Sequence, residues 1–191
     1  MAPSPRTGRN ITRSRRFNSS SAKPCCSAAG GRRSGTGLGS PPSDALSGSI
    51  GPDGIHRKLI RVYFEDTDFS GAVYHANYLR FCERGRTDCL RVMGVHHHEL
   101  HKGEGGGLVF VVRRMECDFH KPARIDDLLE VRTVCLEAGG ARAVLGQRIV
   151  RGETLLFEAR VTVALVGADG RPRRFPQGLA CAFKALQPRP D

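Results

Sequence analysis

The sequence contains no apolar run of about 18 residues, the length at which a segment becomes a candidate to cross a bilayer. It also lacks the continuous apolar segment that follows the basic residues of a secretory signal. No G-x-S-x-G motif is present, which argues against a serine hydrolase with a nucleophile elbow. The glycines at positions 35, 37 and 39 follow no predicted strand and do not complete a dinucleotide-binding fingerprint. These absences argue against a membrane-spanning protein, a protein with a secretory signal, a serine hydrolase and a dinucleotide-binding enzyme.

None of the seven cysteines belongs to a C-x-x-C pair, and their number is odd. Such a set suits neither a disulfide framework nor a structural zinc site. Most of the cysteines after position 80 lie in apolar segments, where buried free thiols are common. We therefore expect reduced thiols and a cytoplasmic protein.

Acidic residues are nearly absent from the first 50 positions. This segment has eight Lys or Arg residues and one acid, Asp44, among many Ser, Gly, Pro and Ala residues. The net charge of +11 divides into +7 for this segment and +4 for the rest of the chain. We expect residues 1–52 to be a disordered basic tail and residues 53–187 to form one domain.

Three interpretations of the tail stay open. Its Arg-rich, Ser-rich and acid-poor composition is typical of an organelle transit peptide, and equally of an unstructured extension or of upstream codons read from an early start site. A nucleic-acid-binding arm has a similar composition, but Phe17 is the only aromatic residue there and no folded reader accompanies it. We therefore expect no nucleic-acid partner.

The most informative segment is residues 61–86, RVYFEDTDFSGAVYHANYLRFCERGR. The aromatic and β-branched residues at 59–64 predict a strand, and residues 65–71 have the composition of a turn. From His75 to Gly94, apolar residues recur at three- and four-residue steps, which predicts an amphipathic helix. This order places carboxylates beside the amides of a helix N-terminus, which is suited to hydrolysing an activated carbonyl.

Four strand-like segments follow the helix, at residues 108–120, 128–138, 141–151 and 154–166. Pro122 follows the end of the first segment, and short glycine turns join the other three, which predicts antiparallel hairpins. Residues 176–186 predict a short closing helix. A long helix followed by long antiparallel strands must be buried against the sheet, so we expect an α+β fold.

The segment resembles the hot-dog-fold acyl-CoA thioesterases, specifically the 4-hydroxybenzoyl-CoA thioesterase group and its Tol-Pal-associated branch. The pattern Asp-Thr-Asp-x-x-Gly-x-Val-Tyr-His covers residues 66–75, and Tyr78, Glu83 and Arg86 follow at fixed helical offsets. The resemblance extends from about position 56 to 184 and implies a long central helix wrapped by an antiparallel sheet. Further matching segments are residues 110–115, 122–127 and 147–149.

The resemblance assigns the catalytic carboxylate to Asp68, either as general base on water or as nucleophile on the thioester. An Asp before a helix can also be only a cap, which is our interpretation of Asp66. The resemblance places the backbone N–H of His75 as the oxyanion donor, and the imidazole is a candidate for orienting water or Asp68. Phe64 stands where some relatives carry a tyrosine, so we expect no phenol-assisted step.

Candidate substrate-binding residues also follow from the resemblance. Tyr74 and Tyr78 line the acyl pocket or, alternatively, fill the core. Glu83 matches an acidic position of the family, with an ion pair to Arg86 or Arg80 as the alternative. The phosphates of coenzyme A require cations, and the candidates by position on or beside strands are Arg113, Arg114 and Arg142.

The histidines at positions 96, 97, 98 and 101 raise the question of a metal site. Helical spacing could bring His97 and His101 together, but only Glu99 could join them, and closed zinc sites need four ligands. We expect a polar turn after the helix and no metal.

The expected activity is hydrolysis of acyl-CoA thioesters to a carboxylic acid and coenzyme A, without a metal or nucleotide cofactor. The expected partners are the acyl-CoA substrate, a second copy in a homodimer or homotetramer, and Tol-Pal envelope proteins. Two alternatives stay open. One is a hot-dog acyl-CoA dehydratase, which would use a catalytic histidine. The other is a non-catalytic acyl-CoA-binding or envelope-associated scaffold protein, in which Asp68 only caps the helix.

Overall fold

The computed structural model describes residues 46–102 and 107–189. These residues form a six-stranded antiparallel sheet in the order β1-β2-β4-β5-β6-β3. The helices are η1 (Phe64–Asp66), α1 (His75–Val92), α2 (His97–Lys102) and α3 (Gln177–Ala185). The strands are β1 (Ser49–Ile50), β2 (His56–Arg61), β3 (Leu108–Phe119), β4 (Leu128–Gly139), β5 (Arg142–Arg151) and β6 (Thr154–Gly167).

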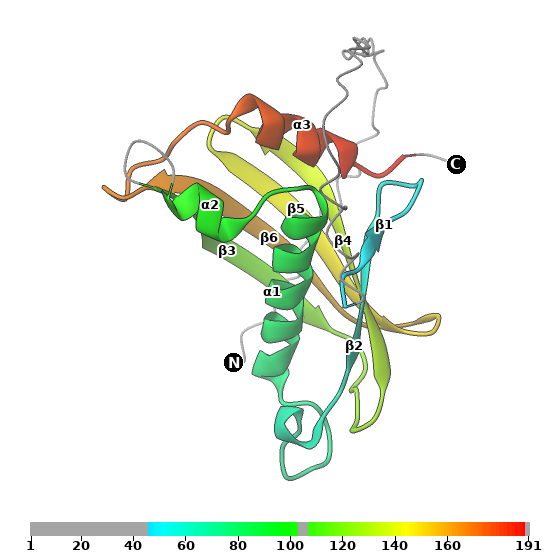
Figure 1. Ribbon diagram of the computed structural model, residues 1–191. Helices are drawn as coiled ribbons and strands as arrows, with labels where there is room; N and C mark the ends of the chain where they lie inside the picture. The colour runs from blue at the N-terminus through cyan, green and yellow to red at the C-terminus, as the bar shows by residue number, and fades with distance from the viewer. Residues whose placement is uncertain (1–45, 103–106, 190–191) are drawn as a thin grey trace, which may run out of the picture. The chain divides into compact units, whose positions relative to one another are not determined.

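Helix α1 lies across one face of the sheet, where it contacts β2, β4 and β5 (Figure 1). Its buried stripe includes Phe81, Cys82 and Cys89, which recur at helical spacing. Gly85 lies on the same stripe, and a Cβ there would be 2.7 Å from Val131 Cγ1 of β4. The glycine therefore lets the helix approach the sheet closely.

No helix among the described residues is long and apolar enough to cross a membrane.

Strands β4, β5 and β6 form the predicted meander. Gly140 and Gly152 have positive φ angles of 61° and 57° in its two tight turns, a conformation that glycine adopts without strain. β3 pairs with β6 from Leu108↔Gly167 to Phe119↔Phe157, with one irregularity between Val112 and Arg114. β3 is the last strand on its side, so one edge is unpaired within the described part of the chain.

The structure differs from the sequence-based expectations at three places. Ser49 and Ile50 form β1 and pair with β2, although they were assigned to the tail, whose residues 1–45 lie outside the described residues. β2 ends at Arg61, and residues 64–66 form η1 rather than the end of a strand. The expected polar turn after α1 is the short helix α2, because its residues continue helical bonding after Gly94 ends α1.

A buried polar cluster, which we call the Asp88 cluster, ties α1 to the first two strands. Asp88 accepts hydrogen bonds from Gly48 N–H at 2.7 Å and His56 Nε2 at 3.0 Å, and pairs with Lys58 Nζ at 3.0 Å. His56 is fully buried, and its Nδ1 has no hydrogen-bond partner among the described residues. Lys58 also donates to the carbonyl of Leu46 at 2.6 Å. The segment before β2 is thus fastened to the helix.

Candidate active site

The turn between β2 and α1 is organised around Asp66. Its carboxylate Oδ2 accepts the N–H of Tyr63 at 2.9 Å, which closes the single turn of η1. Its backbone carbonyl accepts two donors from the start of α1, the N–H of Tyr74 at 2.9 Å and Nδ2 of Asn77 at 2.8 Å. Asp66 is buried, with an exposed fraction of 4%. These bonds fit the turn-shaping role predicted for this residue.

Asp68 lies two residues farther on and is exposed. Its Oδ1 accepts the hydroxyl of Ser70 at 2.5 Å and the N–H of Ser70 at 2.8 Å. These hydrogen bonds, with a smaller electrostatic contribution from the nearby His75, hold the pKa of Asp68 below its usual value. The side chain is therefore an ionised carboxylate at neutral pH. No hydrogen bond to a described residue occupies Oδ2, so it can face water or a substrate.

The backbone between Asp68 and the helix is also fixed. Asp68 N–H donates to Ala72 O at 2.9 Å, and Gly71 N–H donates to Asp68 O at 3.0 Å. Gly71 has a φ angle of 73°, which suits glycine at this point of the turn. Val73 N–H then donates to Ala123 O at 2.9 Å, which anchors the chain to the loop between β3 and β4.

His75 is the first residue of α1, as predicted, and is exposed. The N–H groups at the start of an α-helix have no intrahelical acceptor, and the helix dipole makes this end positive. Asn77 N–H bonds to Tyr74 O at 2.8 Å, but no described residue accepts from the N–H of His75. That amide is available to an oxyanion. The centre of the imidazole ring lies 4.3 Å from that of the Tyr74 ring, with the two planes tilted by 56°, and Tyr74 is also exposed.

Tyr78, predicted to line the acyl pocket or alternatively to fill the core, is a core residue. It is 3% exposed and packs against the rings of Phe81, Phe119 and Phe157. Its hydroxyl accepts the N–H of Ala123 at 2.8 Å. The phenol therefore fastens α1 to the loop that also holds Val73.

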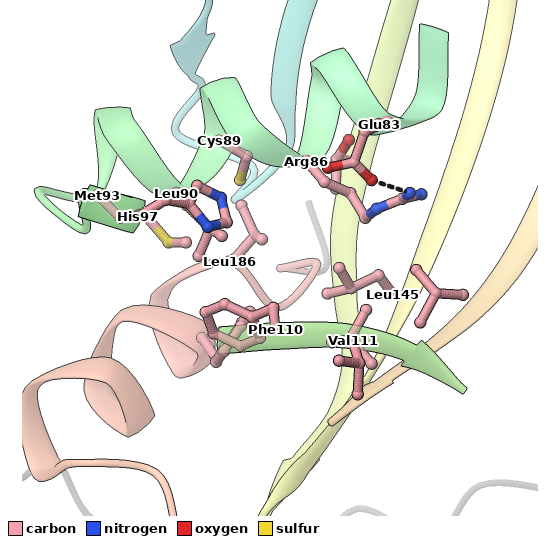
Figure 2. A pocket seen from close by; sticks show the side chains of 14 residues that line it. Glu83, Arg86, Cys89, Leu90, Met93, His97, Phe110, Val111, Leu145 and Leu186 are labelled. Atoms are coloured by element: carbon pink, nitrogen blue, oxygen red, sulfur yellow. Dashed lines mark hydrogen bonds and ion pairs between the residues drawn. The ribbon is translucent and has the colours of Figure 1, made fainter. Parts of the chain in front are cut away.

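Glu83 and Arg86 line a cavity between α1 and the sheet (Figure 2). Their side chains form an ion pair, and Arg86 Nη1 also donates to Gln147 Oε1 at 2.6 Å. The cavity, of about 60 Å³, is mainly apolar. Glu83 thus has both its predicted ion pair and a position beside a cavity. Other lining residues are Cys89, Leu90, Met93, His97, Phe110, Val111, Val112, Thr133, Leu145, Val163, Phe183 and Leu186.

The three arginines predicted to bind coenzyme A do not lie together. Arg114 pairs with Glu116 at 2.6 Å on the edge strand β3, beside the exposed Arg113. Arg142 begins β5 and pairs with Glu137 at 3.7 Å. The site turn lies at the other end of β5, about 30 Å along the strand. Within one chain, Arg142 is therefore too far from Asp68 to bind the part of the substrate that lies beside the turn.

Two other cations lie at the end of the sheet that carries Asp68. Arg61 Nη1 donates to Asp126 O at 2.8 Å, and an added Cβ at Gly71 would be 4.0 Å from Arg124 Nη1. Sequence analysis missed both. The bridge between Ala72 and Arg124 brings the loop to the turn. Residues 122–127 match the thioesterase family in sequence, which drew attention to this loop. The sequence did not indicate that the loop lies beside the turn of Asp68.

The histidines after α1 do not gather with other ligands. Among residues 46–102 and 107–189, no group of three or more His, Cys, Asp or Glu side chains could hold a metal ion. His97 contacts the ring of Phe110 at 6.2 Å and lines the cavity.

Comparisons with known proteins identify the family and the fold of this chain. A family model described as Thioesterase superfamily matches residues 70–161. The acyl-CoA thioester hydrolase YbgC of Escherichia coli O6:H1 is 44% identical over 133 residues, which cover 68% of this chain and 96% of that protein. The chain belongs to the thioesterase superfamily. The acyl-CoA thioesterase YbgC of Haemophilus influenzae is 40% identical over 129 residues, covering 67% and 93% of the two chains.

Solved thioesterase structures share the fold of this thioesterase. A probable thioesterase from Bartonella henselae has a TM-score of 0.62 and 48% identity, and the match covers 64% of this chain and 99% of that one. A 1,4-dihydroxy-2-naphthoyl-CoA thioesterase from Synechocystis has a TM-score of 0.63 at 22% identity, covering 69% and 97%, which shows the shared fold. The predicted family, the hot-dog α+β fold and the enzyme class are therefore confirmed.

Proposed function

We propose that this thioesterase hydrolyses acyl-CoA thioesters to a carboxylic acid and coenzyme A at the turn between β2 and α1. The observation that carries the proposal is the pairing of an exposed, ionised Asp68 with the open N-terminus of α1. Both are fixed to one framework through Asp66, Ala72 and Ala123. A carboxylate and a preorganised amide are the two groups that thioester hydrolysis needs.

In the general-base route, Asp68 takes a proton from water while the water oxygen bonds to the thioester carbonyl carbon. The carbonyl oxygen becomes an oxyanion and accepts the N–H of His75. The C–S bond then breaks, the carbonyl re-forms, and the coenzyme A thiolate leaves and takes the proton from Asp68, which restores the carboxylate. In the nucleophilic route, an Asp68 oxygen attacks the carbon instead, the C–S bond breaks, and the coenzyme A thiolate leaves a mixed anhydride on Asp68. Water then cleaves the anhydride, which releases the carboxylic acid and restores the Asp68 carboxylate. Both routes use the same two groups and no cofactor.

We propose that the cavity behind Glu83 and Arg86 accepts part of the acyl group. Its 60 Å³ holds only a few water-sized groups, so a longer chain must displace its walls. Along the axis of α1, Glu83 is about 12 Å from His75. For the coenzyme A phosphates, Arg61 and Arg124 are the candidates beside the turn in the same chain. Arg113 and Arg114 stay candidates from the edge strand.

A second copy is the partner we propose for the unpaired edge of β3, giving a homodimer that can assemble further. Edge strands pair readily with another chain, and β3 has Val109, Val111 and Val112 partly exposed. The turn itself needs a cover, because Phe64 and Phe69 beside Asp68 are 81% and 105% exposed. A partner would exclude water from the site, which strengthens its electrostatics.

The cellular location of the enzyme is a further proposal. We propose a cytoplasmic enzyme, supported by the free thiols of Cys82, Cys89, Cys117, Cys135 and Cys181. Burial raises the pKa of Cys82 and of Cys89 to about 12, so these thiols are unreactive. Association with Tol-Pal envelope proteins is a further proposal, which co-purification with those proteins would test.

The test is release of free coenzyme A thiol from a panel of aliphatic and aromatic acyl-CoAs by the purified full chain. We expect turnover on at least one member of the panel and its loss in Asp68→Asn. Binding of acyl-CoA without turnover by the unmodified protein would overturn the proposal and favour the scaffold alternative. Hydration of an enoyl-CoA without thiol release would favour the dehydratase alternative instead.

A further inference from the structure

Asn77 is a buried polar residue whose side chain has no role in the chemistry described above. It is the third residue of α1 and is 4% exposed. Asparagine is a poor helix former compared with the alanine, leucine or glutamate that this position could hold. An acidic residue would also suit the first turn better, because it would complement the helix dipole. Helix stability alone therefore does not explain Asn77.

The contact of Asn77 does explain it. Its Nδ2 donates to the carbonyl of Asp66 at 2.8 Å across eleven positions of the chain. The same carbonyl accepts the N–H of Tyr74 at 2.9 Å. One oxygen atom thus receives two donors from the start of α1, one from the backbone and one from a side chain. Because the bond is buried, it exchanges little with water and holds a defined geometry.

We infer that Asn77 is a positioning residue that sets the distance between the Asp68 carboxylate and the N–H of His75. Asp66 comes two residues before Asp68, and the Tyr74 amide comes one residue before His75. A bond that fixes Asp66 to the first turn of α1 therefore fixes both reacting groups relative to each other. The inference rests on the proposed thioesterase activity and adds to it a residue that touches neither substrate nor reacting atoms.

Loss of this bond should reduce turnover rather than substrate binding. The Tyr74 bond stays in Asn77→Ala, so the turn still forms, but it can shift relative to the helix. A shift of about 1 Å at the reacting groups costs up to about 100-fold in rate. We expect kcat to fall about 10- to 100-fold with KM within twofold of its original value.

Asn77→Asp gives a signature that a merely structural role would not give. The carboxylate has the same shape and suits the helix N-terminus, but it cannot donate to Asp66 O. When the introduced carboxyl is protonated, its O–H can donate again. We therefore expect a low kcat at neutral pH and partial recovery, relative to the unmodified enzyme, as the pH falls toward 5.

The matched control is Cys82→Ala, which removes a fully buried side chain from the same helix without touching the turn. It should lower the melting temperature and leave kcat unchanged. Circular dichroism at each pH verifies that all variants are folded. A kcat of folded Asn77→Ala within twofold of the unmodified value, or no recovery of Asn77→Asp in acid, would overturn the inference.

A second readout separates this inference from the proposed activity. Carboxyl ¹³C NMR titration reports the pKa of Asp68 without any substrate. If Asn77 sets the distance between Asp68 and His75, Asn77→Ala should weaken the His75 contribution and move that pKa slightly toward the ordinary value of an aspartate, and Cys82→Ala should not. An inactive unmodified protein with this NMR result would contradict the activity and support the positioning. An active enzyme with an unmoved pKa and full turnover in Asn77→Ala would contradict the positioning alone.

Discussion

Two aspartates near opposite ends of α1 are held in opposite ways. Asp68, before the helix, is exposed and bonded by one neighbour, Ser70. Asp88, in the last turns, is 3% exposed and bonded by Gly48, His56 and Lys58. A carboxylate that is bonded through both oxygens stabilises the fold, whereas one with a free oxygen can react. The number of partners, rather than the residue type, therefore separates the chemical end of the helix from the structural end.

Exchange of each aspartate for asparagine tests this contrast most directly. Asp68→Asn should lower turnover by about 10²- to 10⁴-fold, because the ionised base or nucleophile is lost, while the melting temperature stays unchanged. Asp88→Asn should leave turnover unchanged and cost about 2–3 kcal/mol of folding free energy, because buried donors lose a charged acceptor. Steady-state kinetics and urea unfolding measure the two effects. A stability loss in Asp68→Asn with full activity would reverse the assignment.

At the reactive end, backbone and ring contributions of His75 can be separated. His75→Pro removes the N–H but suits the first position of a helix, so it should cost about 2.7–4 kcal/mol of transition-state stabilisation. His75→Ala keeps the N–H and should reduce turnover only modestly. The measurement is kcat of both variants, with circular dichroism verifying their fold. Equal inactivity of the two would make the imidazole the catalytic element.

At the structural end, the Asp88 cluster should make the domain sensitive to acid. Burial lowers the pKa of His56 below its unfolded value of 6.5, although Asp88 opposes the shift. The unfolded chain then binds the proton more readily, so the free energy of unfolding should fall as the pH decreases below about 6.5. Urea unfolding between pH 5 and pH 8 measures this. His56→Gln should make the free energy of unfolding depend less on pH, whereas substitution of the exposed His98 by Asn should leave this dependence unchanged. An unchanged pH dependence in His56→Gln would show that the Asp88 cluster does not cause the acid sensitivity.

Truncation gives the smallest effect and locates the boundary of the domain. Deletion of residues 1–45 should leave melting temperature and turnover unchanged, because β1 and the Asp88 cluster are kept. Deletion of residues 1–52 removes β1 and the amide of Gly48, and should lower stability by about 1 kcal/mol. Thermal unfolding of both forms measures the difference. Equal melting temperatures would mean that β1 contributes nothing to the fold.

The long elements could be predicted because their signals are local. The three- and four-residue spacing after His75 gave α1, and alternation with glycine turns gave the meander. The Asp68 turn was recognised from its motif and its place before the helix. Contacts between distant positions left no such signal. His56 meets Asp88 across 32 positions, and Arg124 reaches Gly71 through a bridge between loops. Tyr78 was ambiguous because a pocket residue and a core residue have the same helical spacing.

The order of the strands has a consequence for biosynthesis. The proposed reacting groups of Asp68 and His75, and Asn77 that positions them, lie between positions 68 and 77, but α1 packs on β4 and β5, and β3 pairs with β6. The local hairpins of the meander close quickly, whereas pairings between distant segments form late. A ribosome therefore releases the reactive turn well before the sheet that supports it. We expect the nascent chain to acquire its activity only after residue 167, the end of β6, has left the exit tunnel.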